Sequence, residues 1–211
     1  MILVEECKLR LDDSIEPWLP ELANRHVLKF LSSDIDDTVP ALRAITVRDL
    51  LTYRMGFGSV MVMPDTYPIQ RLIREYRIGG DGPMLPSQAP GMEEWLQKLG
   101  SLPLLAQPGE RWMYQVSGDV LGTLIVRVSG QSLGTFMSER IFDPPGMKDT
   151  AFHVPPEKID RLPAFYVFNR QTSKLDFLTR WQTVPGGLSR PPNRAEAGLS
   201  RRSMTTLPSA A

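Results

Sequence analysis

Apolar residues recur every three or four positions along four stretches in the middle of the chain, which places them on one face of an α-helix. These stretches are 69–76, 92–99, 120–128 and 133–141. Asp119 and Ser132 precede the last two, at the position where a side-chain oxygen can cap the first backbone amides. Gly100 and Gly130 follow two of the stretches as expected helix ends. The pattern therefore predicts four amphipathic helices.

Two shorter helical signals precede these. Residues 1–9 are apolar from the first position and lack a capping residue, which is typical of the last turns of a helix. The run Thr46-Val-Arg-Asp49 has the form of a capping box, so a helix is predicted to begin after its threonine and to end at Gly56-Phe-Gly58. The acidic stretch 32–40 and the proline- and glycine-rich stretch 81–90 are expected to be loops.

Strand signals appear only later in the chain. Residues 164–168 are dense in aromatic and β-branched side chains and 169–174 are typical of a turn, which predicts a β-hairpin. A further strand entry is predicted at 150–154. From Arg180 onward arginine, proline, serine and threonine dominate and no periodicity remains. We therefore predict an α-rich α+β domain over residues 1–178, followed by an irregular tail over 179–211.

Composition narrows the class of partner. The 211 residues carry 24 basic and 24 acidic side chains, and 42% are hydrophobic, which is enough for a core. Because the charge is balanced and no basic stripe appears, we expect no nucleic acid and no membrane as a partner, and a neutral small molecule fits better. No apolar run approaches the length of a membrane span and no signal peptide is recognisable, so a cytoplasmic location is the default expectation.

The sequence offers few metal ligands. Cys7 is the single cysteine, so an internal disulfide is excluded, and its place in an amphipathic run predicts a buried thiol. His26 and His153 lie far apart, with no cysteine or histidine at ligand spacing. We expect neither a metal nor another cofactor.

The most informative stretch is 107–122. Pro108-Gly109 marks a tight turn, Trp112 and Tyr114 fall on the same side of a short extended run, and a helix starts soon after. Such a junction can lift a side chain out of the packed layer and position the phenol of Tyr114 as a proton acceptor. A tyrosine packed beside Trp112, with its hydroxyl on a backbone carbonyl, explains the same pattern. The glycine turn at Gly56 either borders a pocket or only ends a helix.

Six short motifs follow one another along the chain. They are Val4 to Asp13, Ile45 to Thr52 with Gly56, Gln107 to Gly109, Tyr114 to Gly122, Ser129 to Leu133, and Ile141 to Met147. In this order they resemble the landmarks of the serine β-lactamase-related hydrolases. That family includes class C β-lactamases, family VIII esterases and D-Ala-D-Ala carboxypeptidases. The resemblance covers about residues 1–178.

The resemblance implies a mechanism. In the family, the serine of a Ser-x-x-Lys motif is acylated by an ester or amide, and a tyrosine shares the proton transfers with the lysine. The family's tyrosine corresponds to Tyr114, which is therefore the expected catalytic residue, and Trp112, Ser117 and Gly56 are expected to line the substrate pocket. Val116 stands where class C β-lactamases carry asparagine, so the motif is more similar to the esterase branch.

The sequence also departs from the family. Tyr53 stands where histidine is common, which we interpret as a packing change. No serine is followed by lysine at the third position, so the nucleophile motif is missing. The family's glycine-rich segment and later sheet strands are not recognisable, and Gly198 to Pro208 resembles that segment read in a shifted frame. We therefore expect a chain truncated at both ends that keeps the helical domain and a hairpin but lacks most of the sheet.

These features leave more than one function open. The first is an esterase-like serine hydrolase that acts on a small ester or amide through an acyl-enzyme, and that is inactive as the isolated chain. The second is a non-catalytic helical fragment that binds a partner or an apolar ligand. The third is complementation by a separate chain that carries Ser-x-x-Lys. Apolar faces left bare by the missing sheet are expected to favour self-association.

Overall fold

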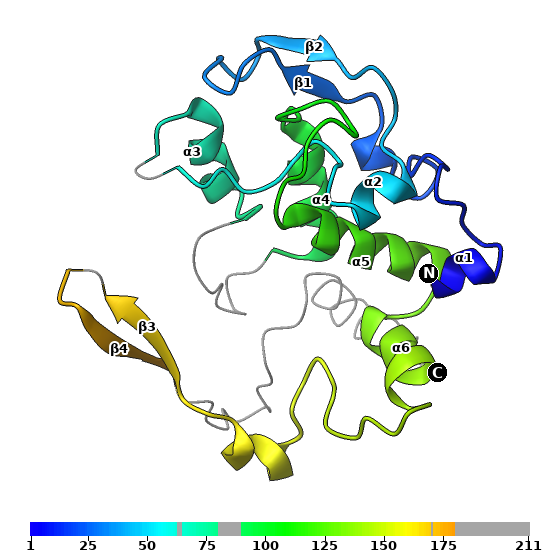
Figure 1. The fold of residues 1–211 in the computed structure, drawn as a ribbon, viewed down its shortest axis with the longest axis vertical. Coiled ribbons are helices and arrows are strands. Elements are labelled where there is room, and N and C mark those ends of the chain that lie inside the picture. Colours follow the sequence, from blue (N-terminus) through cyan, green and yellow to red (C-terminus); the bar gives the residue numbers. More distant parts are fainter. Residues whose placement is uncertain (63–64, 80–89, 170, 180–211) are drawn as a thin grey trace, which may run out of the picture.

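The computed structural model describes residues 1–62, 65–79, 90–169 and 171–179 (Figure 1). In chain order its elements are α1 (Ile2–Glu5), the 3-10 turn η1 (Pro20–Leu22), β1 (His26–Leu28), β2 (Thr38–Pro40), α2 (Val47–Leu51), α3 (Pro68–Glu75), α4 (Met92–Ser101), α5 (Val116–Ser129), α6 (Leu133–Met137), the π-helical stretch η3 (Ser138–Phe142), the 3-10 helix η4 (Pro156–Arg161), β3 (Phe165–Asn169) and β4 (Lys174–Thr179). The predicted α-rich α+β fold with a hairpin is confirmed. Within these ranges no helix has both the length and the apolar character that crossing a membrane requires. The predicted tail from residue 180 and most of the predicted loop at 81–90 lie outside the described residues.

α5 is the element around which the core is built. It contacts both α2 and α6 and lies in the middle of the helical part in Figure 1. Its side chains at Val116, Val120 and Leu124 are buried, and their spacing of four residues places them on one face of the helix. Trp95 and Leu99 of α4 belong to the same core. The predicted helices at 69–76 and 92–99 are confirmed as α3 and α4.

The beginning of α5 differs from the prediction. The helix starts at Val116, with Gln115 as its N-cap, so Asp119 lies inside the first turn and is not the cap. An acidic side chain is also favourable there, because the first turn carries the positive end of the helix dipole. The predicted end is correct, since Gly130 takes the left-handed conformation with φ 71°.

The beginning of α2 is confirmed and its end is not. The Asp49 amide donates to Thr46 Oγ1 (3.2 Å) and the Thr46 amide donates to Asp49 Oδ2 (2.9 Å), which is the predicted capping box. The helix ends at Leu51, and Tyr53 already has φ 58°. The predicted end at Gly56-Phe-Gly58 is therefore wrong, because a tyrosine, which rarely adopts a positive φ, takes the left-handed conformation before the glycines are reached.

The strand predictions are partly correct. β3 and β4 form the predicted antiparallel hairpin, with Asn169 opposite Lys174 at its closed end. β2 lies within the stretch predicted to be a loop and pairs with β1; its three residues are too few for an alternating pattern to show. Residues 150–154 contain bends and no strand, so that prediction is wrong. Cys7 is exposed and not buried, because α1 ends at Glu5 and the helical face does not continue.

An arginine joins three elements around the core. Arg127 of α5 donates to both carboxylate oxygens of Glu21 in η1 (2.7 and 2.8 Å) and to Glu93 in α4 (2.8 Å). It also donates to the Trp18 carbonyl oxygen at 2.8 Å. The side chains of Arg127 and Glu21 are only 20% and 19% exposed. The ion pairs are therefore less screened by solvent than a surface pair.

A second arginine fixes the end of α4. The Arg25 guanidinium donates to the carbonyl oxygen of Leu99 at 3.1 Å and also to those of Gly100 and Leu102. These carbonyls lie where the helix leaves acceptors without intrahelical partners. Burial lowers the pKa of Arg25 to about 10, so the side chain remains charged at neutral pH. Its charge then interacts favourably with the negative end of the α4 dipole.

Replacing Arg127 with methionine should destabilise the chain. The change leaves Glu21 and Glu93 without their shared cation, and we expect the free energy of unfolding to fall by about 2 kcal/mol. Urea denaturation followed by far-UV circular dichroism measures it. Arg161→Met is the control, because that side chain is 65% exposed in its pair with Asp149, and it should change stability by less than about 0.5 kcal/mol. Equal losses in the two variants would contradict a structural role for the Arg127 network.

Candidate active site around Tyr114

Two segments that are distant in the sequence run side by side and meet at Tyr114. One is 53–59, which follows α2, and the other is 105–114, which precedes α5. Backbone amides of each donate to carbonyl oxygens of the other: Leu105 to Gly56 (2.7 Å), Gly109 to Arg54 (2.8 Å), Met113 to Tyr53 (2.8 Å) and Ser59 to Tyr114. We call this pairing the backbone ladder. Because its last bond is made to Tyr114 itself, the ladder fixes the position from which that side chain projects.

Two glycines allow the segments to approach so closely. A β-carbon at Gly56, where φ is 91°, would collide with the carbonyl oxygen of Ala106. A β-carbon at Gly58 would lie 2.6 Å from the carbonyl oxygen of Tyr114 and 2.7 Å from the β-carbon of Met113. Neither position has room for a side chain. Gly56 therefore has the close backbone approach that its sequence context predicts.

Three aromatic rings lie in a row beside the ladder. The ring centroid of Trp112 lies 6.3 Å from that of Tyr53 and 6.2 Å from that of Tyr114. The ring planes are inclined by only 28° and 27°, so the rings are stacked. We call Tyr53, Trp112 and Tyr114 the aromatic row. Tyr53 is not among the site residues that the sequence predicts; its ring stacks on Trp112 and its backbone takes the left-handed conformation.

Tyr114 lies at the surface and not in the core. It is 45% exposed and its neighbour Trp112 is 61% exposed. The tyrosine does pack beside Trp112, as one interpretation of the sequence proposed, but within the described residues its hydroxyl makes no hydrogen bond to a backbone carbonyl. An exposed phenol without a partner is the state in which a tyrosine can exchange a proton with a substrate or a nucleophile.

Ser117 and Gly56 lie inside the protein. Ser117 is in the first turn of α5 and fully buried, and its hydroxyl oxygen has no hydrogen-bond partner in the part of the chain that the structure describes. Gly56 is buried under the ladder. The structure therefore brings Trp112 and Tyr114 together at the surface, whereas the expected contact of Ser117 and Gly56 with substrate stays a prediction.

An ion pair between a buried carboxylate and a partly exposed arginine supports the turn that leads into the site. Asp49 is 4% exposed and accepts hydrogen bonds from Arg43 Nη2 and from the Thr46 amide, both at 2.9 Å. A β-carbon at Gly109 would collide with the Arg43 guanidinium, so the pair packs directly against the Pro108-Gly109 turn. Burial by itself raises the pKa of Asp49, but the hydrogen bonds from Arg43 and Thr46 outweigh it and hold that pKa below its usual range.

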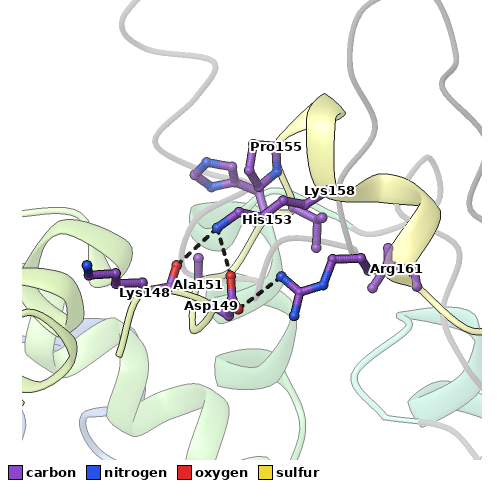
Figure 2. A pocket seen from close by; sticks show the side chains of 9 residues that line it. Lys148, Asp149, Ala151, His153, Pro155, Lys158 and Arg161 are labelled. Carbon is purple, nitrogen blue, oxygen red and sulfur yellow. Dashed lines mark hydrogen bonds and ion pairs between the residues drawn. The ribbon is translucent and has the colours of Figure 1, made fainter. Parts of the chain in front are cut away.

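A pocket of about 340 Å³ lies in another part of the chain, at the residues around η4 (Figure 2). Asp149 there accepts hydrogen bonds from Lys158 (2.7 Å) and Arg161 (3.0 Å), and these two cations hold the pKa of its carboxyl group below the usual range. All residues that line it fall between 148 and 162, so it includes none of the four predicted site residues. Its carboxylate is neutralised by its own neighbours, and we assign it no chemistry.

Comparison with known proteins decides the family. The β-lactamase family model matches residues 1–189. The chain belongs to the β-lactamase family. Protein Rv1367c of Mycobacterium tuberculosis is 37% identical over 173 residues, which are 81% of this chain and 40% of that protein. Lovastatin esterase of Penicillium rubens is 34% identical over 153 residues, 71% of this chain and 35% of that enzyme. The chain thus spans less than half the length of these members of the β-lactamase family.

Two solved structures share the fold of this chain. EstCE1, a hydrolase with promiscuous acyltransferase activity, has a TM-score of 0.65 at 24% identity, and the likeness covers 93% of this chain and 50% of that one. A mutant form of simvastatin synthase from Aspergillus terreus has a TM-score of 0.61 at 26% identity. This likeness covers 94% of this chain and 48% of the simvastatin synthase chain. The resemblance to the serine β-lactamase-related hydrolases is confirmed.

Asp49→Asn should make the free energy of unfolding depend less steeply on pH in acid. Because the pKa of Asp49 is lower in the folded chain than in the unfolded one, its contribution is present above the unfolded value of about 3.9 and is lost as the pH falls through the folded value. Below about pH 4 the free energy of unfolding should therefore fall more steeply for the unmodified chain than for the variant. Urea denaturation at a series of pH values measures this. Asp36→Asn, at an exposed aspartate whose carboxylate pairs with no cation among the described residues, should keep the original slope. An Asp49→Asn slope that also stays unchanged would contradict the assignment.

Gly58→Ala should disturb the backbone ladder that supports Tyr114. The new methyl group would force the carbonyl of Tyr114 or the side chain of Met113 to move, at a cost of about 1–3 kcal/mol of unfolding free energy. The indole N–H resonance of Trp112 in a ¹H–¹⁵N spectrum should shift as well, because the row moves with the ladder. Gly91→Ala is the matched control, since no atom lies within 4 Å of the added carbon. A Gly58→Ala protein as stable as this control would show that the ladder yields without strain.

Proposed function

We propose that this chain supplies the proton-accepting tyrosine of an esterase-like serine hydrolase site that works through an acyl-enzyme. The observation that carries the proposal is the placement of Tyr114, whose backbone is fixed by the ladder while its phenol is exposed and free of hydrogen bonds among the described residues. Structural tyrosines usually bury the ring and satisfy the hydroxyl. A ring held rigidly with its hydroxyl open suits a group that exchanges protons.

The proposed chemistry assigns one step to Tyr114. A serine oxygen attacks the carbonyl carbon of the ester while its proton moves to the Tyr114 oxygen. The bond from the carbonyl carbon to the alcohol oxygen then breaks, and the alcohol leaves with that proton. Water cleaves the acyl-enzyme by the same route, with the tyrosine again accepting and returning a proton. Trp112 stands next to the phenol, where it would contact the substrate.

The partner groups of this step belong to the Ser-x-x-Lys motif. A free phenol has a pKa near 10, so a proton-accepting tyrosine needs a neighbouring ammonium group that favours the phenolate. No serine of this chain is followed by lysine at the third position. We therefore propose that the isolated chain holds the acceptor without the nucleophile and forms no acyl-enzyme, while the site it belongs to acts on a small ester or amide.

Esters are favoured over β-lactams as substrates. Val116 occupies the position at which an asparagine amide is expected in class C β-lactamases, and a valine has no amide to offer a substrate. Its side chain is also buried in the first turn of α5. The relative from Penicillium rubens is named as a lovastatin esterase. Both observations support ester hydrolysis or acyl transfer as the reaction of the complete site.

A chimaera tests the role of Tyr114. The matched 153 residues of the lovastatin esterase would be replaced with those of this chain, so that the remainder of that enzyme supplies the nucleophile. We expect the chimaera to hydrolyse 4-nitrophenyl butyrate and to be labelled by a fluorophosphonate. Tyr114→Phe in the chimaera should lower kcat by about 10²- to 10⁴-fold with little change in KM. The isolated chain should show neither a nitrophenol burst nor a label.

Two results would contradict the proposal. One is stoichiometric fluorophosphonate labelling of the isolated chain, which would reveal a nucleophile other than Ser-x-x-Lys. The other is a folded, active chimaera in which Tyr114→Phe leaves kcat unchanged. Tyr76→Phe, at a tyrosine that ends α3 and lies outside the aromatic row, is the matched control and should not change kcat.

A further inference from the structure

We propose that the aromatic row recognises a flat, apolar ring of the substrate, so that the esters accepted here carry an aromatic or cyclic group beside the reacting carbonyl. The proposal rests on the proposed function, because only that function makes the bound ring part of a substrate. The binding itself can be measured without catalysis. It adds Tyr53 to the site and assigns it a positioning role for the ring of Trp112.

Exposure is the first observation. Trp112 is 61% exposed, whereas Trp95, which belongs to the core, is fully buried. Large aromatic side chains bury their surface where they can, and exposed ones that gather together mark places where another molecule binds. The indole of Trp112 stacks with both Tyr114 and Tyr53. The exposed indole thus lies directly beside the proposed reaction centre.

The geometry of the row suits a flat ligand. Successive ring planes are inclined by less than 30°, and the centroids are 6.2 and 6.3 Å apart. Offset rings at these distances form a stepped surface of aromatic faces, on which a further ring can stack in the arrangement that aromatic pairs prefer. A flexible aliphatic chain covers such a surface less completely and loses more rotamer freedom when it binds.

The backbone holds the row at both ends. Tyr53 has φ 58°, a conformation that costs a non-glycine residue free energy and persists only when its surroundings impose it. Its hydroxyl lies 3.1 Å from the place of a β-carbon at Gly118, so the glycine leaves room for it at the first turn of α5 and a larger residue would press against it. The ladder holds the other end at Tyr114. A preorganised surface of this kind loses little entropy when a ligand binds.

Charge favours a neutral ring over a cation. The two cation–ring contacts found in the described residues are Lys98 on Tyr76 and Arg140 on Phe136, and both lie outside the row. Among the described residues no carboxylate makes a hydrogen bond to Tyr53, Trp112 or Tyr114, so the row holds no anion of its own for a bound ammonium group. The occupant that fits is therefore the uncharged ring of an ester.

The test compares two neutral esters that share an acetyl group. 2-Naphthyl acetate carries a flat ring and octyl acetate carries a chain of similar size. Each is titrated into the full 211-residue chain while the indole N–H signals of its four tryptophans are followed in ¹H–¹⁵N spectra. The Trp112 signal, assigned by its loss in Trp112→Phe, should shift with 2-naphthyl acetate, and the signal of buried Trp95 should not. Octyl acetate should bind at least about 3-fold more weakly.

Variants then locate the binding. Trp112→Ala and Tyr53→Leu should each weaken 2-naphthyl acetate by about 3- to 10-fold, and Trp112→Phe should keep part of the affinity because it keeps a ring. Tyr166→Ala removes an exposed aromatic side chain from the hairpin and should leave the affinity unchanged. Far-UV circular dichroism confirms that each variant is folded before it is titrated.

Three outcomes would overturn the inference. They are equal affinity for the two esters, an unchanged affinity in folded Trp112→Ala, and a Trp112 signal that shifts only with protein concentration, which would make the row a contact between two copies of the chain. Failure of the proposed function is recognised separately. In that case Tyr114→Phe has no effect on kcat in the chimaera, whereas the preference for the ring ester in binding remains.

Discussion

The backbone ladder between residues 53–59 and 105–114 is the constraint on which the rest of the site depends. It joins the end of α2 to the beginning of α5, and these two helices also contact each other in the core. The rings of Tyr53, Trp112 and Tyr114 all belong to its two segments. Any change that widens the ladder must therefore move both the core contact and the row. The ladder stays narrow because glycines stand at 56 and 58 in its first segment. In its second segment, the ion pair of Arg43 with Asp49 packs against Gly109.

Periodic patterns predicted the fold well where helices are long and half-buried. α3 and α4 follow their apolar spacing to within two residues, and the capping box of α2 is present as its sequence indicates. The predictions fail where a short-range signal competes with tertiary contacts. Asp119 has the chemistry of an N-cap, yet α5 begins earlier because Val116 is buried in the core. β2 is too short to carry a pattern of its own and exists through its pairing with β1.

The site could be located from sequence, but its extent could not. The turn at Pro108-Gly109 and the following aromatic residues pointed to Tyr114 and Trp112, and these two do lie together at the surface. Tyr53 was interpreted as a packing change, because nothing in a sequence shows that residue 53 adopts a positive φ and stacks on a residue 59 positions later. A pattern cannot show either that Ser117 faces inward, since the helix register depends on where α5 begins.

The left-handed backbone at Tyr53 restricts the residues that this position can hold without conformational cost. Asparagine, aspartate and histidine adopt positive φ more readily than other non-glycine residues, and histidine is common at this position in the family that the chain resembles. β-branched residues are the least compatible with that conformation. A tyrosine here retains a conformational cost that asparagine would reduce, and asparagine would remove the ring. Tyrosine at this position therefore combines a ring stacked on Trp112 with a backbone conformation that is unfavourable for an aromatic residue.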